Sequence, residues 1–241
     1  MFNHKLNEKA SFKTYADWFL LAFLAGNVNT GGFLSAGRFV SHVTGFATLT
    51  GISFERGHLL EAFGLMSIPG YFLAGVMVSG FLTEKQKSTD VHGQKYAPVM
   101  GIVALLLAVV TLAGILNFIG DFGAPENFGH DYFLLALLCG ACGLQNAAIT
   151  SASGSTVRTS HLTGLFTDLG LGLIRAEVHH VNPERRATDR KANLLRLGTI
   201  LSFFLGSLSG AFAYSNFHYL GFLLPTLLAL YAAFSAARQS E

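Results

Sequence analysis

A polar segment occurs twice in a chain that is otherwise rich in apolar residues. The sequence SHVTG at residues 41–45 returns as SHLTG at residues 160–164, an offset of 161 − 42 = 119 residues between the two histidines. Over residues 41–57, seven of seventeen positions are identical at this offset. The identical positions in the first copy are Ser41, His42, Thr44, Gly45, Thr48, Gly51 and Arg56. An internal repeat sets the architecture of a chain, so we expect two related halves.

The composition indicates that these halves lie in a membrane. Hydrophobic residues make up 51% of the 241 residues, and charged residues only 12%, whereas soluble domains carry about 25% charged residues. The net charge of +2 is too small to indicate nucleic-acid binding. The only cysteines, Cys139 and Cys142, cannot form a disulfide framework.

Six stretches reach the roughly 20 apolar residues that a helix needs to cross a bilayer. They are residues 15–36, 57–82, 98–118, 131–152, 192–214 and 217–237. Pro69 in the second stretch and Pro225 in the sixth predict kinks. No convincing cleavage site follows the polar residues 1–14, so we interpret the first stretch as a span and not as a signal peptide.

Basic residues predict the orientation of these spans. Lysines and arginines cluster in residues 1–14, 83–97, 175–191 and 238–241, whereas residues 119–130 contain none. The positive-inside rule therefore predicts that both termini are cytoplasmic and that residues 119–130 form an outer loop.

The repeat and the spans together predict a 3+3 inverted repeat within a single membrane domain. Residues 15–118 form the first half and residues 131–237 the second. Each half holds three spans, an odd number, so the two halves enter the membrane in opposite senses. Many transporters have this plan, with the solute site near the midplane between the repeats.

Each half also contains a segment that we do not expect to cross the membrane. Residues 43–54 and 162–174 follow the two motifs and are too short to span, so they predict re-entrant half-helices. Gly, Asn, Ser and Thr are frequent in residues 26–32 and 145–155, and this composition predicts a broken first helix in each half.

The repeated motif has the chemistry of a solute site. Serine at the start of an apolar run is a good N-cap, so Ser41 and Ser160 are expected to cap the half-helices. Two positive helix ends would then face one another and favour an anion. The candidate binding residues are Ser41, His42, Thr44, Gly45, Ser160, His161, Thr163 and Gly164, with Asn27, Asn29, Gln145, Asn146, Arg38 and Arg158 close before the motifs.

A purely structural interpretation of these residues stays open, because small and hydroxyl residues are the usual contacts between membrane helices. Asp168 has Leu49 as its counterpart. It is a candidate for carrying a coupling proton, or else a carboxylate paired with an arginine or water at the cytoplasmic edge. Gly198, Ser202, Gly206 and Gly210 recur at every fourth position, which predicts close helix packing, either within the chain or in a homodimer.

Cys139 and Cys142 form a C-x-x-C sequence. This pattern occurs in membrane thiol oxidoreductases, which need a second thiol pair or a partner to relay electrons. The chain has no other cysteine, so packing is the favoured interpretation. No nucleotide-binding or hydrolase motif is present, and we expect no catalytic residue, cofactor or metal.

The runs AGNVNTGGFLSAGRFVSHVTGF and CGLQNAAITSASGSTVRTSHLTG resemble the YoaK-like family of bacterial membrane proteins, a domain of unknown function. The resemblance extends over nearly the whole chain and implies a six-span protein of the inner membrane. It supplies no substrate and no catalytic residue. The family pattern has Asn after the first TG, where this chain has Phe46, so a polar side chain is not required there.

The sequence thus predicts a transporter or channel for a small polar solute, with an anion favoured, whose partners are the bilayer and that solute. Two alternatives remain. One is a membrane redox protein or enzyme that uses Cys139 and Cys142 or the two motif histidines. The other is a membrane scaffold that transports nothing.

Overall fold

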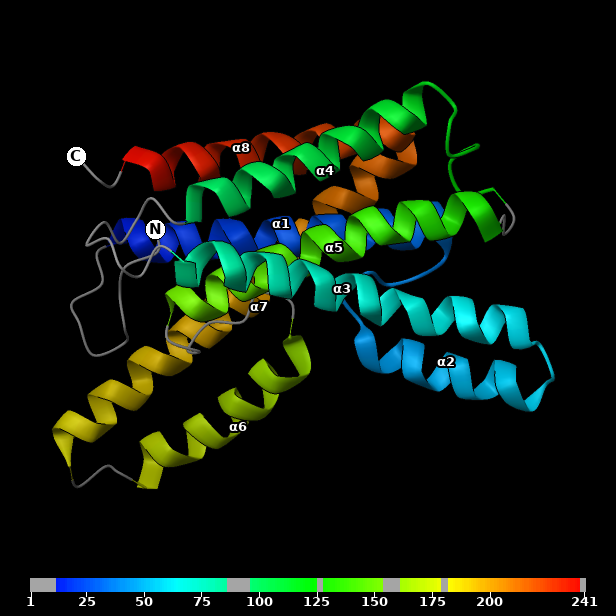
Figure 1. Cartoon of the computed structure of the whole chain (residues 1–241). Coiled ribbons are helices and arrows are strands. Elements are labelled where there is room, and N and C mark those ends of the chain that lie inside the picture. The colour runs from blue at the N-terminus through cyan, green and yellow to red at the C-terminus, as the bar shows by residue number, and fades with distance from the viewer. Residues whose placement is uncertain (1–11, 86–95, 125–127, 154–160, 179–181, 239–241) are drawn as a thin grey trace.

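The computed structural model describes residues 12–85, 96–124, 128–153, 161–178 and 182–238. The elements in these ranges are helices, which confirms the predicted all-α class (Figure 1). In chain order they are α1 (Phe12–Ala36), α2 (Val43–Glu55), α3 (Leu59–Lys85), α4 (Ala97–Ile115), α5 (Phe128–Ala152), α6 (Leu162–Val178), α7 (Pro183–Phe217), the short 3-10 helix η4 (His218–Phe222) and α8 (Leu223–Arg238).

Among the described residues, five helical segments are long and apolar enough to cross a membrane, judged by length and composition. Four of them correspond to α1, α3, α4 and α5. The fifth, Pro183–Arg238, contains both remaining predicted spans. His218 follows α7 with φ 51° and ψ −127°, and η4 turns the chain there so that α8 runs back along the bundle (Figure 1).

Several predicted boundaries were displaced for local reasons. Helix α7 begins at Pro183, well before residue 192, because Asn182 caps it by accepting a hydrogen bond from the Arg185 amide at 3.1 Å. Helix α4 ends at Ile115 because Asn117 adopts a positive φ of 58°. Pro225 lies in the first turn of α8, where its missing amide proton removes no helical hydrogen bond.

The predicted break in the first helix of each half was wrong. Helices α1 and α5 continue without interruption through residues 26–32 and 145–152. The polar and small residues there serve contacts between helices. A side chain at Gly26 would collide with the backbone carbonyl of Phe203, and the Gln145 amide donates to the Leu21 carbonyl at 2.7 Å. Such residues let helices approach closely without opening the backbone.

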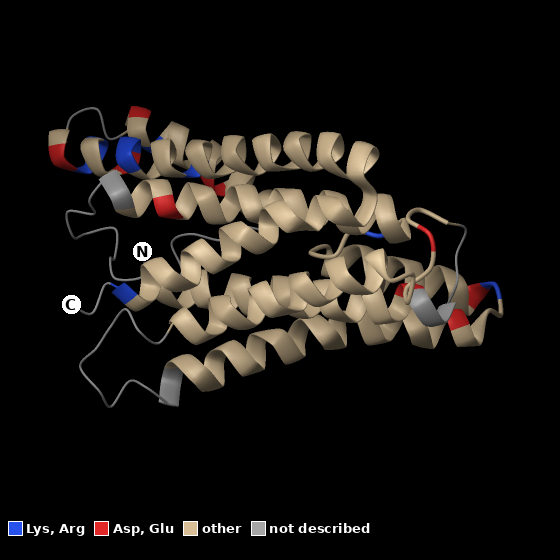
Figure 2. Ribbon diagram, turned by 90° about the horizontal axis from the view of Figure 1, so that it is seen from above, with Lys and Arg blue, Asp and Glu red and all other residues tan. Residues whose placement is uncertain are grey.

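Charged side chains gather toward the two ends of the bundle, and the ribbon between them is almost entirely uncharged (Figure 2). Basic residues in α6, α7 and the last turn of α8 include Arg175, Arg185, Arg186, Arg190, Lys191, Arg196 and Arg238. A continuous uncharged belt is what a bilayer interior requires of the surface that faces it. The fold is therefore that of a helical membrane protein.

Two pairs of helices make the most extensive contacts, α1 with α7 and α3 with α5. Both crossings use glycine against a backbone carbonyl. A Cβ at Gly206 would collide with the Phe23 carbonyl, as a Cβ at Gly75 would with the Gly140 carbonyl. The two glycines, Gly75 and Gly206, are 206 − 75 = 131 residues apart, and the residues that carry the two carbonyls, Phe23 and Gly140, are 140 − 23 = 117 residues apart.

The second contact at each crossing keeps these offsets. Gly26 meets the Phe203 carbonyl and Gly143 meets the Phe72 carbonyl, with 143 − 26 = 117 and 203 − 72 = 131. The two crossings therefore have the same design. They also explain the stripe of small residues on α7, because Gly198, Gly206 and Gly210 all face α1 within the same chain.

We call α2 and α6 the short helices; α8, with 16 residues, is also short but continues directly from η4. Helices α2 and α6 contain 13 and 17 residues, which at about 1.5 Å per residue gives roughly 20 and 26 Å, less than the hydrocarbon thickness of about 30 Å. Helix α6 ends at Val178, four residues beyond the predicted end. Both helices begin beside the middle of the bundle and run toward opposite ends, α2 against α3 and α6 against α7 (Figure 1).

We predict that Gly206→Ala lowers the stability of the protein by about 1–3 kcal/mol, the usual cost of overpacking a tight contact. The collision would be with backbone, which cannot rotate away as a side chain can. Gly101→Ala on α4 is the matched control, because open space surrounds that glycine and alanine favours a helix. Thermal unfolding of the two purified variants in detergent measures the difference, and equal stabilities would contradict the close approach of α1 and α7.

Candidate functional site

A cavity of about 670 Å³ lies where the two short helices begin. Its volume is within the range of roughly 300–1,000 Å³ that is typical of small-molecule sites. Residues of α1, α2, α3, α5, α6 and α7, with the segments that precede α2 and α6, form its wall. The lining residues are Asn29, Phe39, Ser41, His42, Val43, Thr44, Phe72, Asn146, Thr150, His161, Leu162, Thr163 and Phe203.

Most of this lining consists of pairs, one residue from each half of the chain. His42 and His161, Val43 and Leu162, and Thr44 and Thr163 are each 119 residues apart. Asn29 and Asn146 are 117 residues apart, and Phe72 and Phe203 are 131 apart, the same offsets as in the helix crossings. The cavity thus lies where the two related halves of the chain meet.

The segment before α2 is fixed by Asn29 of α1. Its Oδ1 accepts hydrogen bonds from the Ser41 hydroxyl at 3.0 Å and the Ser41 amide at 3.3 Å. Ser41 was expected to be the N-cap of α2, and this was wrong. His42 occupies the N-cap position and makes no side-chain capping bond. The Ser41 hydroxyl is directed to α1 because the amide oxygen of Asn29 is a strong acceptor within its reach.

The first amides of both short helices lie at the cavity. Val43 and Thr44 begin α2, Leu162 and Thr163 begin α6, and all four line the cavity. The first amides of a helix have no acceptor within it, and the helix dipole places a partial positive charge at this end. Together these features favour an anion or the oxygen of a polar solute at the cavity.

Each histidine lies over a glycine in the first turn of its own helix. A Cβ at Gly45 would be 2.8 Å from Nδ1 of His42, and a Cβ at Gly164 would be 2.9 Å from Nδ1 of His161. Carbon and nitrogen cannot approach so closely without a shift, so any larger residue would push the ring away. The repeated glycines therefore leave room for both imidazoles to lie against the start of their helices at the cavity wall.

The hydroxyl groups of the motif threonines face a similar environment in both halves. One turn further along, Thr48 donates to the Thr44 carbonyl at 3.2 Å and Thr167 donates to the Thr163 carbonyl at 3.0 Å. Within the described part of the chain, neither the Thr44 hydroxyl nor the Thr163 hydroxyl has such a bond. They are thus available to hydrogen-bond a solute in the cavity.

Some predicted site residues lie elsewhere. Asn27 is fully buried between α1 and α7, where its Oδ1 accepts from the Tyr214 hydroxyl at 2.8 Å and its Nδ2 donates to Ser209 at 3.1 Å. Gln145 is buried against α1 through its bond to Leu21. These two amides hold helices together and do not line the cavity.

The predicted charged residues also lie outside its lining. Arg38 lines two smaller neighbouring pockets, one with Glu61 and Asp131 and the other with His42. Asp168 is exposed on α6. Ser160 and Arg158 belong to a segment outside the described residues.

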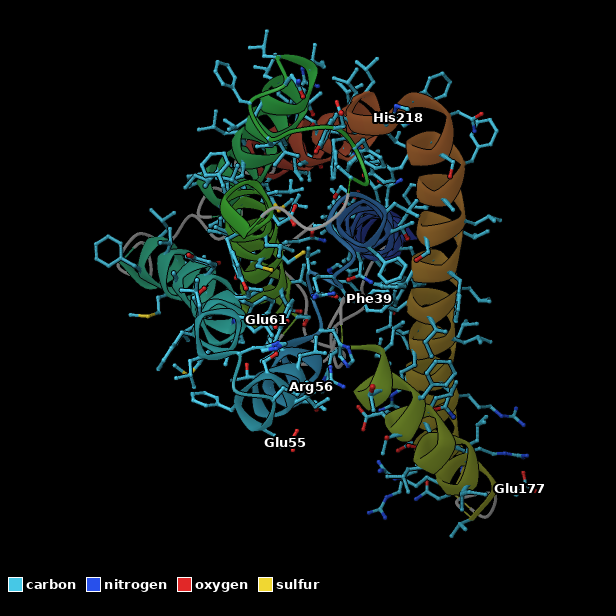
Figure 3. The ribbon with its side chains drawn as sticks, turned by 90° about the vertical axis from the view of Figure 1, so that its right-hand side faces the viewer. Phe39, Glu55, Arg56, Glu61, Glu177 and His218 are labelled. Carbon is cyan, nitrogen blue, oxygen red and sulfur yellow. The ribbon has the colours of Figure 1, made fainter. Side chains whose placement is uncertain are left out.

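Three phenylalanines in the lining were missed by the sequence reasoning. Phe72 and Phe203 carry the carbonyls that receive Gly143 and Gly26, so their position follows from the helix crossings. Phe39 is stacked on Phe33 of α1, with ring centroids 4.5 Å apart. Phe39 is 45% exposed, and Figure 3 shows it near the middle of the view, away from Glu55 and Glu177 at the ends of the short helices. With 22 phenylalanines in the chain, only the shared offset of 131 could have identified the first two.

Cys139 and Cys142 are buried in the core of α5, with 1% and 5% of their surface exposed, and both are free thiols. They belong to the packed layer between helices and not to the lining of the cavity.

We predict that a hydrophilic thiol reagent modifies Thr44→Cys and Thr163→Cys, because both positions line a cavity of this volume. Val103→Cys on α4, where the native side chain is 1% exposed, serves as the control, and the native cysteines provide an internal one. Mass spectrometry of the labelled protein identifies the modified positions. Equal protection of Thr44→Cys and Val103→Cys would show that water does not enter the cavity.

A family model described as a protein of unknown function (DUF1275) matches residues 18–235. No curated protein matches the chain, and no solved structure does. The match includes both copies of the motif and every residue that lines the cavity.

Proposed function

The chain belongs to the DUF1275 family, and on that premise we propose that it is a multi-pass protein of the bacterial inner membrane that transports a small polar solute, preferably an anion. One observation carries the proposal. The two copies of the only repeated polar motif, from opposite halves of an apolar chain, contribute to one cavity of about 670 Å³. Ionisable and polar residues inside a membrane are costly and typically mark a solute or ion pathway.

The proposed arrangement is a 3+3 inverted repeat of six spans. Helices α1, α3 and α4 belong to the first half, and α5, α7 and α8 to the second. Three features support it. The halves share constant sequence offsets at their helix crossings, the short helices run in opposite directions (Figure 1), and η4 separates two helices within Pro183–Arg238. In such folds the solute binds between the repeats.

Helices α2 and α6 act as re-entrant half-helices in this proposal. Each is shorter than the hydrocarbon layer, and each begins beside the middle of the bundle (Figure 1). A helix can begin at membrane depth only where its first amides are buried in protein or face a wet cavity. The position of both starts at the cavity wall meets this condition.

An anion is favoured over a cation by the groups that surround the solute. No carboxylate occurs among the described lining residues, whereas two helix starts, two histidines and two asparagines do. Helix starts and amide or imidazole N–H groups are donors, and donors stabilise negative charge.

The redox alternative has less support, because the thiols of Cys139 and Cys142 are buried in the packed core. Reactive cysteines lie in partly exposed, electropositive surroundings.

The orientation follows from the charge asymmetry, with both termini in the cytoplasm. We predict that alkaline phosphatase, which is active only outside the cytoplasm, is active when fused after residue 125 and inactive when fused after residue 185. β-Galactosidase, which is active only in the cytoplasm, should give the opposite result in cells. The same side for both fusions would exclude the inverted repeat.

We predict that Thr44→Val and Thr163→Val each weaken solute binding by about 10- to 150-fold, because a hydrogen bond to a charged group contributes roughly 1.5–3 kcal/mol. A solute-uptake screen in liposomes, with and without a pH gradient, first identifies the solute. Affinity and thermal stability are then measured on the same purified variants.

Thr48→Val and Thr167→Val are matched controls, because they remove a hydroxyl one turn along the same helices that already donates to a helix carbonyl. They should leave affinity nearly unchanged. If stability falls and affinity stays constant in the Thr44 and Thr163 variants, the motif threonines serve packing and the proposed site is wrong.

A further inference from the structure

We propose that the central cavity binds a monocarboxylate with an apolar body together with one proton, which His42 or His161 accepts. This inference rests on the proposed transport function and specifies its solute class and its coupling. It replaces Asp168 as the candidate for the coupling proton, because that side chain lies outside the lining of the cavity.

The first argument concerns which groups at the cavity can take up a proton. The described lining from α1, α3, α5 and α7 consists of Asn29, Phe72, Asn146, Thr150 and Phe203, none of which titrates. The two short helices contribute Val43, Thr44, Leu162 and Thr163, which also do not titrate. His42 and His161 are thus the titratable side chains of the described lining.

Charged residues lie beyond His42 in the described residues. Arg38 lines a pocket of about 250 Å³ on the other side of His42, and Phe39 and His42 form the wall shared by that pocket and the cavity. Arg38 also lines a third pocket together with the carboxylates of Glu61 and Asp131. The charges near Arg38 are therefore mixed, and none of these three residues belongs to the described lining of the cavity.

An anion bound in the cavity and a proton are expected to bind together. A negative charge close to an imidazole favours its protonated form, and both imidazoles belong to the lining of the cavity. Because binding free energies are reciprocal, an anion that promotes protonation binds more tightly when the proton is available. Transfer of an anion and a proton together also leaves no net charge to move through a low-dielectric interior, where an uncompensated charge is costly.

The second argument concerns the charge and shape of the solute. One proton neutralises one carboxylate, so a dianion would carry a second negative charge into the low-dielectric interior without a proton to compensate it. Phe39, Phe72 and Phe203 provide apolar walls. At about 30 Å³ per water molecule, the 670 Å³ of the cavity corresponds to about twenty waters, far more than a small inorganic anion displaces. A carboxylate on an aromatic or branched apolar body matches both the polar and the apolar parts of the lining.

Benzoate is the probe, and the purified full-length protein in detergent is the sample. Isothermal titration calorimetry in two buffers of different ionisation enthalpy counts the protons taken up on binding. We expect uptake of up to one proton, and an affinity that falls by up to about tenfold per pH unit as pH rises through the imidazole range of about 5 to 8. Terephthalate, chloride and neutral benzamide should each bind at least tenfold more weakly.

The variants assign the proton. His42→Asn combined with His161→Asn should bind benzoate weakly and equally at every pH, as the neutral wild type does at high pH. Asp168→Asn should keep both the affinity and the proton uptake of the wild type. The wild-type buffer comparison needs no variant, so the proposal can be tested even if the double variant does not fold.

Binding of benzoate without proton uptake overturns the proposal, as does a pH dependence that survives in the double variant or disappears in Asp168→Asn. Binding of terephthalate, chloride or benzamide as tightly as benzoate overturns the solute class. If benzoate does not bind but the liposome screen finds another transported solute, only this inference falls. If the screen finds no transported solute, the proposed function falls with it.

Discussion

Backbone amides in a hydrocarbon layer have no water to bond, and an unsatisfied amide there costs several kcal/mol. The long helices meet this constraint internally, but α2 and α6 begin beside the middle of the bundle (Figure 1). In the proposed topology their first amides are directed to a region that α1, α3, α5 and α7 must keep hydrated or filled by a solute. The cavity is then a requirement of the proposed chain path and not an incidental packing defect.

Helix α1 shows how one element serves both packing and the cavity. Successive helical residues are rotated by about 100°, so Asn27 and Asn29 lie about 200° apart around the helix axis. Asn27 faces α7 and bonds Tyr214 and Ser209, whereas Asn29 faces the start of α2 and holds Ser41. Two neighbouring amides of the same type thus have separate roles, which the sequence alone does not distinguish.

The helices and the duplicated motif could be predicted because apolar length and sequence identity are local properties. The helix crossings could not be predicted, because glycines such as Gly26 and Gly143 occur both where a membrane helix is broken and where two helices pack closely. The capping role given to Ser41 failed for a related reason, since its acceptor, Asn29, is twelve residues away. The pairing of Asn29 with Asn146 was not visible in the sequence alignment of the two halves. Residues of the first helices are 117 positions apart, whereas residues of the two motifs are 119 apart. Only the arrangement in space places Asn29 and Asn146 on one wall.

The pattern of helix contacts has a consequence for how the two halves are joined. The extensive contacts of α1 are with α7, and those of α3 are with α5, whereas α3 and α4 touch little although they are neighbours in the chain. Each half therefore finds its packing partners mainly in the other half, and neither has a complete core by itself. The described part of the link between α4 and α5 belongs to this interlock, because Phe122 stacks on Tyr214 and His218 of the second half. Two separately synthesised fragments, ending after α4 and beginning before α5, would still have complementary surfaces through which to assemble, much as the two subunits of an antiparallel dimer do.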